Sequence, residues 1–253
     1  MKPHEEWHLE TACVGRRVLV FDRLDSTNTY ALGHANDPDN DGLVVLANEQ
    51  TAGRGQHGRT WTCPEGGGVL MSVLVFPPAA LQRPAILTAW AAVSVCELIL
   101  KTTGLQARIK WPNDVLVDER KVCGILIEQT RGAVVGIGLN VNQSVDHFIA
   151  AGLSQGASLA MLTRQRFLCR NMARLLTEML DADYGRLCQG DVRTLERHWQ
   201  QRLGLLGKTV EIEATSQQVA GRIRALTFAG LEVEMADHSI RRLLPEVVKH
   251  IRC

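Results

Sequence analysis

Three apolar segments near the middle of the chain constrain its fold more than any other feature. They cover residues 107–111, 121–128 and 133–141, and each has the length of a strand. Only a short turn separates the last two, whereas parallel neighbours need a crossover of a dozen or more residues. These two strands therefore pair antiparallel. The sequence predicts a mixed α+β domain rather than an alternating, doubly wound sheet.

The remaining pattern fits the same fold class. Residues 17–21, 43–47 and 68–76 are further apolar strands, and Pro77 and Pro78 end the last of them. Apolar residues at helical spacing predict helices elsewhere. One expected helix begins near Thr29. Three others cover residues 84–101, 163–184 and 192–202.

The hydrophobic pattern changes after Gly207. Apolar residues then recur at every second position, as in Val210, Ile212 and Ala214. This spacing is typical of half-buried strands. We therefore expect two domains, residues 1–205 and a small β-barrel or sandwich over residues 206–253.

Composition excludes several classes of protein. With 28 Lys and Arg against 27 Asp and Glu, the formal net charge is +1, so no overall positive field attracts nucleic acid or anionic membranes. The longest apolar stretch, residues 85–100, is too short for a membrane span and contains Glu97, which indicates a buried helix. The seven cysteines form no C-x-x-C pair. A reducing, cytoplasmic location is expected.

The most informative segment is residues 48–61, with the sequence NEQTAGRGQHGRTW. Its glycines match both the dinucleotide fingerprint and a P-loop with Arg59 in place of lysine. Both motifs need a helix directly after the loop to hold phosphates, and residues 61–68 (WTCPEGGG) cannot start one. What remains is a flexible loop with free backbone amides, Arg54 and Arg59. Such a loop suits a phosphate or another anion, unless it is only a polar surface loop.

Two further segments place functional groups near strand ends. Lys110 ends a strand before the turn at residues 111–114, and Lys121 opens the next strand. The two lysines therefore project near one end of a sheet, unless they are ordinary solvated charges. Residues 136–142 (GIGLNVN) form a strand with alternating glycines, which either leaves room for a bulky group or marks a bulge.

Five weak motifs occur in order along the chain: residues 25–28 (DSTN), 50–61 (QTAGRGQHGRTW), 110–114 (KWPND), 121–128 (KVCGILIE) and 136–142 (GIGLNVN). Together they resemble the biotin protein ligases. The resemblance implies a mixed, largely antiparallel sheet with helices packed on it, plus a small SH3-like C-terminal β-barrel. It also implies the monofunctional type that does not bind DNA, because too few residues precede Ser26 for a helix-turn-helix module.

The resemblance implies a reaction in two steps. The carboxylate of biotin attacks the α-phosphate of ATP, with Mg²⁺ as counter-ion, and gives biotinyl-5′-AMP and pyrophosphate. A lysine of a biotin carboxyl carrier domain then attacks this mixed anhydride. Lys110 and Arg54 are the implied catalytic residues, with Lys110 as a fixed positive charge between the two anions.

The resemblance also implies the binding residues. Hydroxyl and amide side chains suit the neutral, polar ureido ring of biotin. Many family members have arginine where this chain has Gln56, and glutamine brings no charge. Whether the loop keeps the adenylate from escaping therefore stays open. For biotin the implied residues are Ser26, Thr27, Asn28, Gln50, Arg54, Gly55, Gln56, Lys110 and Gly124; for the nucleotide they are Arg54, Gly55, Arg59, Trp61, Lys121 and Asn140.

Two alternative functions fit the sequence less well. A lipoate protein ligase shares the fold and the adenylation chemistry, but it binds an apolar dithiolane, for which the polar residues near Ser26 are ill suited. A non-catalytic nucleotide- or RNA-binding module would need aromatic platforms and a basic groove, whereas aromatic residues make up only 5% of the chain. The sequence leaves the oligomeric state open, including a homodimer through an exposed edge strand.

Overall fold

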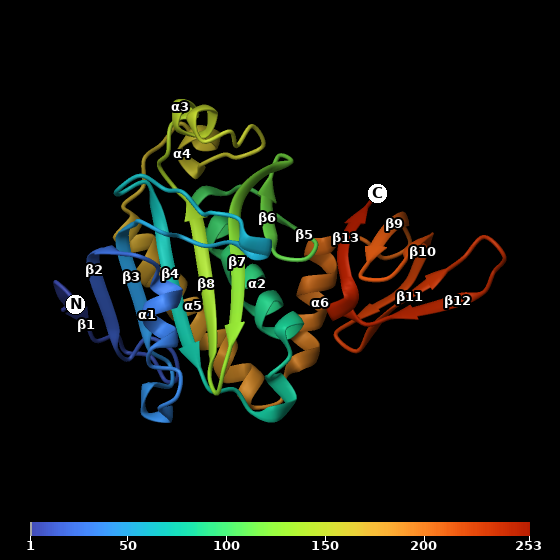
Figure 1. Ribbon diagram of the computed structural model, residues 1–253, viewed down its shortest axis with the longest axis horizontal. Helices are drawn as coiled ribbons and strands as arrows, with labels where there is room; N and C mark the ends of the chain where they lie inside the picture. The colour runs from blue at the N-terminus through green and yellow to red at the C-terminus, as the bar shows by residue number, and fades with distance from the viewer. Residues whose placement is uncertain (1) are drawn as a thin grey trace.

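The computed structural model describes residues 2–253, which form two β-sheets and six α-helices (Figure 1). The strands are β1 (Glu5–Trp7), β2 (Val18–Leu24), β3 (Val44–Gln50), β4 (Gly68–Val75), β5 (Arg108–Lys110), β6 (Asp114–Val117), β7 (Arg120–Gln129), β8 (Ala133–Asn140), β9 (Thr209–Ala214), β10 (Gln218–Thr227), β11 (Gly230–Glu234), β12 (Ile240–Leu243) and β13 (Val248–Arg252). The helices are α1 (Thr27–Leu32), α2 (Pro84–Thr103), α3 (Val145–Ala150), α4 (Leu159–Thr163), α5 (Cys169–Cys188) and α6 (Val192–Leu203).

The larger sheet has eight strands in the order β1-β2-β3-β4-β8-β7-β6-β5. Only β2 and β3 are parallel neighbours; every other pair in this sheet is antiparallel. The expected mixed, largely antiparallel α+β fold is therefore confirmed.

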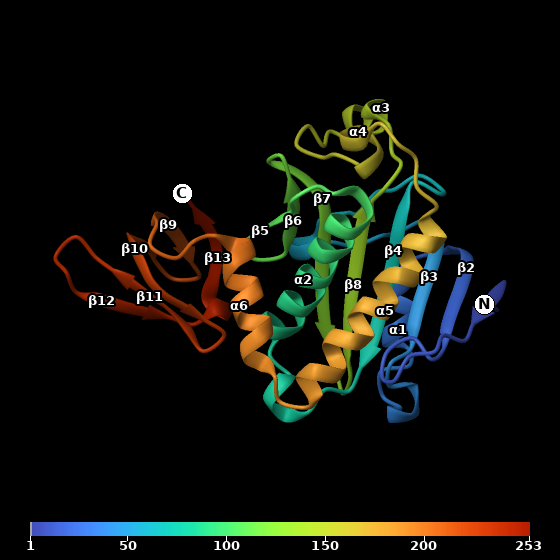
Figure 2. The same cartoon turned by 180° about the vertical axis from the view of Figure 1, so that it is seen from behind.

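Helices cover the two faces of this sheet unequally. Helices α2 and α5 cross one face, with α6 beside α2 (Figure 2), whereas the short α1 lies on the other. Alternate residues of β2 divide between the two layers: Val18 and Val20 belong to the core under α2 and α5, and Leu19 and Phe21 to the core under α1. Much of the α1 face is thus left free of helices, and the functional site forms there.

Helix α2 is long and apolar enough by itself to cross a membrane, but 67% of its most apolar window is buried inside the structure. Trp90, at its centre, is completely buried and donates its indole N–H to the carbonyl of Leu180 in α5 at 3.1 Å. The expected buried helix at residues 85–100 is therefore confirmed as part of the core.

Several elements differ from the sequence prediction, which did not include β1 or α3. Two further differences have a clear local cause. The expected helix over residues 163–184 begins later, at Cys169, and continues to Cys188 as α5. Arg164 adopts a left-handed conformation (φ 59°) that ends the short α4 just before it. Leu168, the N-cap residue of α5, is 71% exposed. Strand β6 was missed because its turn to β7 consists of Asp118 and Glu119, both with positive φ, and lacks the glycine that usually marks such turns.

The second sheet contains five strands in the order β12-β11-β10-β9-β13. It packs against the first through an aromatic cluster, in which Trp199 of α6 lies 5.8 Å from Trp111 and 4.9 Å from Phe228, measured between ring centroids. The indole N–H of Trp111 donates to the carbonyl of Val248 at 2.9 Å. A boundary between residues 205 and 206 stays a prediction, supported by the start of β9 at Thr209.

The Trp111 contact carries a testable prediction. Trp111→Phe keeps an aromatic ring but leaves the buried Val248 carbonyl without its donor, which costs about 1–3 kcal/mol. We expect a lower free energy of unfolding in urea. Trp199→Phe removes a similar volume without removing a recorded hydrogen bond and is the matched control. Equal losses in the two variants would show that packing alone matters at this contact.

Candidate functional site

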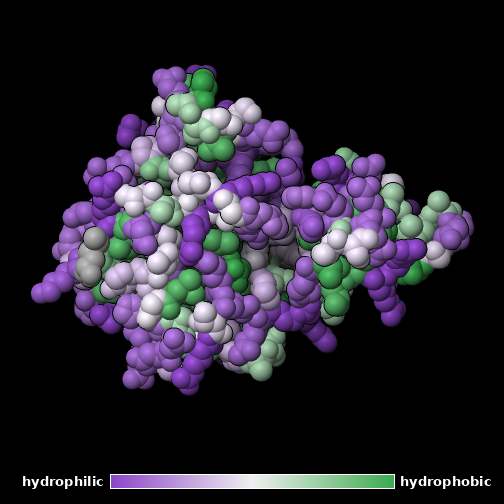
Figure 3. Space-filling model, viewed as in Figure 1, coloured by the Kyte–Doolittle hydropathy of each residue, from purple (hydrophilic) through white to green (hydrophobic). Residues whose placement is uncertain are grey.

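A cavity of about 350 Å³ opens on the sheet face that carries α1. The N-terminal end of α1, the β3–β4 loop (residues 51–67), the turn after β5 and residues 148–156 contribute to its walls. The surface is hollowed where the two sheets meet (Figure 3), and His250 of β13 also lines the cavity. Segments that are far apart in the sequence thus meet around one space.

The cavity brings together all the site residues that the sequence predicted. They are Ser26, Thr27, Asn28, Gln50, Arg54, Gly55, Gln56, Arg59, Trp61, Lys110, Lys121, Gly124 and Asn140.

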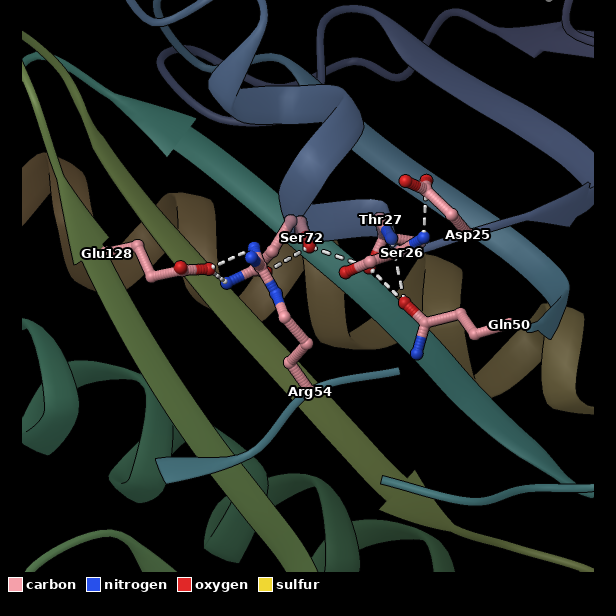
Figure 4. A network of polar contacts seen from close by, with 8 residues as sticks. Asp25, Ser26, Thr27, Gln50, Arg54, Ser72 and Glu128 are labelled. Carbon is pink, nitrogen blue, oxygen red and sulfur yellow. Dashed lines mark hydrogen bonds and ion pairs between the residues drawn. The ribbon is translucent and has the colours of Figure 1, made fainter. Parts of the chain in front are cut away.

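The start of α1 supplies polar groups to one end of the cavity. The backbone N–H and the hydroxyl of Thr27 both lie within hydrogen-bond distance of Gln50 Oε1, at 2.7 and 3.0 Å (Figure 4). The Gln50 nitrogen therefore points away from Thr27 and is available as a donor. Ser26 occupies the N-cap position without a side-chain capping bond, and its backbone N–H donates to Asp25 instead. This end of α1 thus presents hydroxyl and amide groups side by side.

A buried serine lies beneath these groups. The hydroxyl of Ser72 is 2.7 Å from Thr27 Oγ1 and 2.5 Å from Asn28 Oδ1, and Ser72 is completely buried. The Asn28 nitrogen donates to Glu128 Oε2 at 2.8 Å. A carboxylate only accepts hydrogen bonds, so Glu128 fixes which way the Asn28 amide faces. Sequence reasoning assigned no role to Ser72 or Glu128; the available signal for Ser72 was one hydroxyl in an otherwise apolar strand.

Arg54 reaches from the β3–β4 loop to this same group of residues. Its Nη2 donates to Glu128 Oε2 at 2.8 Å, as Figure 4 shows. The guanidinium is thus already paired with a carboxylate, and its predicted catalytic role stays a prediction.

The strand glycines leave room for side chains rather than marking a bulge. A Cβ atom on Gly136 would lie 2.3 Å from Asn28 Oδ1, and one on Gly138 would lie 2.4 Å from the Trp61 ring. A Cβ atom on Gly124 of β7 would likewise lie 2.9 Å from the Trp61 ring. The register between β8 and both of its neighbours is continuous. The expectation of space for a bulky group is therefore confirmed, and Trp61 is one group that occupies it.

The predicted binding residues differ in whether another side chain already pairs with them. Lys110, at the end of β5, is exposed and has no salt-bridge partner within residues 2–253, so its charge is available to an anion. Lys121 forms a 2.6 Å ion pair with Asp114. Asn140 is 5% exposed and accepts a hydrogen bond from Gln143 at 2.8 Å. A ligand would have to displace Asp114 to bind Lys121, and Gln143 to bind the Asn140 oxygen. Lys110 could bind an anion without losing an ion pair.

The carboxylates of the cavity do not form a metal cage. Nowhere in residues 2–253 do three or more His, Cys, Asp or Glu side chains gather in a way that could hold a metal ion. Asp114 is paired with Lys121, and a hydrogen bond from Arg108 lowers the pKa of Glu119, which is therefore anionic at neutral pH. Such a site fits Mg²⁺ that arrives on the phosphates of a nucleotide, because this ion commonly keeps its waters and takes one or two carboxylates.

Comparison with protein families finds a match over the segments that form most of this cavity. Residues 20–142 match the Biotin/lipoate A/B protein ligase family. This part of the chain is therefore similar to the members of that family.

Similar proteins narrow the class further. The chain is 41% identical over 161 residues to "Bifunctional ligase/repressor BirA" of Bacillus subtilis, a match that covers 59% of this chain and 50% of that protein. It is 34% identical over 153 residues to "Biotin--[acetyl-CoA-carboxylase] ligase" of Mycobacterium tuberculosis, covering 56% and 58% of the two chains. The chain thus spans only about half the length of these relatives.

A solved structure extends the likeness to both sheets. The biotin protein ligase from Aquifex aeolicus, in complex with biotin and ATP, superposes with a TM-score of 0.79 at 23% identity. The match covers 93% of this chain and 98% of that one. It supports the fold of the whole chain, including the C-terminal sheet.

Proposed function

We propose that the protein is an ATP-dependent biotin protein ligase. The observation that carries this proposal is a single cavity lined by polar amides and hydroxyls, a glycine-rich loop and an unpaired lysine. The relatives named as biotin--[acetyl-CoA-carboxylase] ligases support it. Biotin is activated to biotinyl-5′-AMP with release of pyrophosphate, and the biotinyl group is then transferred to a lysine.

The end of the cavity near α1 suits the ureido ring of biotin. The Gln50 nitrogen is free to donate to the ureido carbonyl, while the Thr27 hydroxyl can serve as donor or acceptor. The dithiolane of lipoate could replace none of these hydrogen bonds, so binding it would leave polar groups unpaired. The polar lining therefore favours biotin over lipoate, the alternative substrate.

Lys110 performs the central electrostatic task of the first step. The carboxylate and the α-phosphate are both anionic, so they approach each other only if a positive charge lies between them. Because Lys110 has no ion-pair partner among the described residues, it can take this position without giving up another contact. Its charge also stabilises the transition state, in which negative charge builds up on the phosphate oxygens.

The other predicted residues are proposed to hold biotin and ATP in position. Gly55 and Gln56 of the loop offer backbone amides to the anhydride, and Gly124 leaves space beneath it. Trp61 stacks on adenine. The proposed nucleotide contacts also include Arg54, Arg59, Lys121 and Asn140. Mg²⁺ accompanies ATP as part of the substrate and offsets the charge of the leaving pyrophosphate.

The proposed acceptor is the biotin carboxyl carrier domain of a biotin-dependent carboxylase. DNA binding is not part of the proposal, because a formal net charge of +1 gives no general attraction to a phosphate backbone. A homodimer stays a prediction; the edges of the larger sheet are β1 and β5, three residues each, and such short edges pair poorly. The seven unpaired cysteines support the predicted cytoplasmic location.

A transfer assay tests the proposal. The protein is incubated with ATP, Mg²⁺ and an unmodified carrier domain, with either biotin or lipoate, and the intact mass of the carrier is measured. We expect biotin on a single carrier lysine and no lipoyl product. Attachment of lipoate alone would support the alternative ligase, and no attachment of either acid would contradict the proposal.

A further inference from the structure

The middle of the β3–β4 loop, residues 53–62, has few anchors on the body of the protein. Two hydrogen bonds within the loop close its tip, Gln56–Gly58: Gly55 N–H donates to Arg59 O at 2.7 Å, and Arg59 N–H donates to Gln56 O at 3.2 Å. The last part of the loop is held elsewhere, because Gly67 O accepts from the backbone N–H groups of residues 141 and 142. In the middle part, Arg54 and Trp61 are the side chains that reach the sheet, so its position over the cavity depends on these two contacts.

Glu128 is the group on which the first of these contacts depends. The same oxygen, Oε2, accepts from Arg54 of the loop and from Asn28 of α1, each at 2.8 Å. Figure 4 shows the Arg54 side chain extending from the loop to this oxygen. A movement of the Glu128 carboxylate would release the loop and free the Asn28 amide at the same time.

We infer that Glu128 is a positioning residue that anchors the glycine-rich loop over the cavity through Arg54 and orients Asn28. The carboxylate also neutralises Arg54, so the predicted cations without an ion-pair partner within residues 2–253 are Lys110 and Arg59. The expected effect of Glu128 on catalysis rests on the proposed function. Its expected effect on the position of the loop does not.

The physical consequence is a smaller entropic cost of binding. A loop that is already tethered loses less conformational freedom when a ligand becomes enclosed. Removing the anchor should therefore weaken biotin binding while the chemistry at Lys110 proceeds as before. Arg54 is 43% exposed and Glu128 is 28% exposed, so salt screens this pair, and high ionic strength should reproduce part of the effect.

Tryptophan fluorescence can report on the loop without any ligand. Trp61 is partly exposed, whereas the other tryptophans of the chain are no more than 6% exposed: Trp7, Trp90, Trp111 and Trp199. Quenching by acrylamide therefore acts mainly on Trp61. Trp61→Phe should remove most of the quenchable emission, which verifies the assignment.

The test compares Glu128→Gln with Glu232→Gln. Glu232 forms a 2.8 Å pair with Arg242 in the C-terminal sheet and is 35% exposed, so it is a matched control outside the cavity. We expect stronger quenching in ligand-free Glu128→Gln, by about twofold, and a KM for biotin raised by about fivefold to tenfold. The KM for ATP should rise as well, because the same loop carries the proposed nucleotide contacts, whereas kcat should stay within about twofold of the parent protein.

A double-variant cycle separates anchoring from a general structural role. Arg54→Gln and Glu128→Gln should each loosen the loop, and the double variant should be no looser than either one, because both remove the same contact. Quenching of Glu128→Gln equal to that of Glu232→Gln would overturn the inference. If the parent protein activates no biotin, the proposed function fails, while the quenching comparison still decides the role of Glu128.

Discussion

Lys110→Ala is expected to abolish adenylate formation while leaving biotin binding measurable. The ureido end of the cavity, around Thr27 and Gln50, is unaffected by this substitution. The charge between carboxylate and phosphate disappears, however. One well-placed group that stabilises developing charge contributes about 3–4 kcal/mol, which corresponds to a loss of about a hundredfold to a thousandfold in kcat. The measurements are the initial rate of adenylate formation and calorimetric titration with biotin.

The matched control for this prediction is Lys101→Ala. Lys101 is an exposed lysine in the last turn of α2 and does not line the cavity. Its removal should leave both measurements unchanged. A nearly normal kcat in Lys110→Ala would mean that another cation, such as Lys121, supplies the charge.

Gly136→Ala is expected to produce the second large effect, a selective loss of biotin binding. The added Cβ would lie 2.3 Å from the oxygen of Asn28, which is 4% exposed and held by Ser72 and Glu128. Asn28 can give way only by breaking these hydrogen bonds, at a cost of about 1–3 kcal/mol. We expect the KM for biotin to rise by about tenfold to a hundredfold, whereas the KM for ATP changes little.

Gly138→Ala provides the comparison within the same strand. Its Cβ would lie 2.4 Å from Trp61, so this variant should displace the indole and raise the KM for ATP rather than the KM for biotin. Thermal unfolding of both variants verifies that the sheet still folds. If both substitutions raised the KM of the same substrate, the proposed division of the cavity into a biotin end and a nucleotide end would be wrong.

Local patterns were sufficient to predict most of the fold, whereas the cavity residues were implied by the resemblance of five motifs to a known family. Short turns required antiparallel pairing, and the glycines of β8 indicated space that Trp61 and Asn28 fill. The five motifs converge because the sheet brings their strands to one face.

The features that were missed depend on tertiary contacts. Ser72 and Glu128 are ordinary strand residues in the sequence, and their importance appears only when β4 and β7 lie beside α1. The left-handed turn at Arg164 carries no glycine that would predict the end of α4. Similarly, the pairing of Arg54 with Glu128 joins residues 74 positions apart, which no local pattern encodes.

Exchange of labelled pyrophosphate into ATP tests the central claim most directly, because it reports carboxylate activation without a carrier domain and without retention of the adenylate. The assay compares biotin, lipoate and no added acid. We predict exchange that requires biotin and is indifferent to lipoate. Exchange supported by lipoate alone, or by neither acid, would contradict the assignment of this cavity to biotin and ATP.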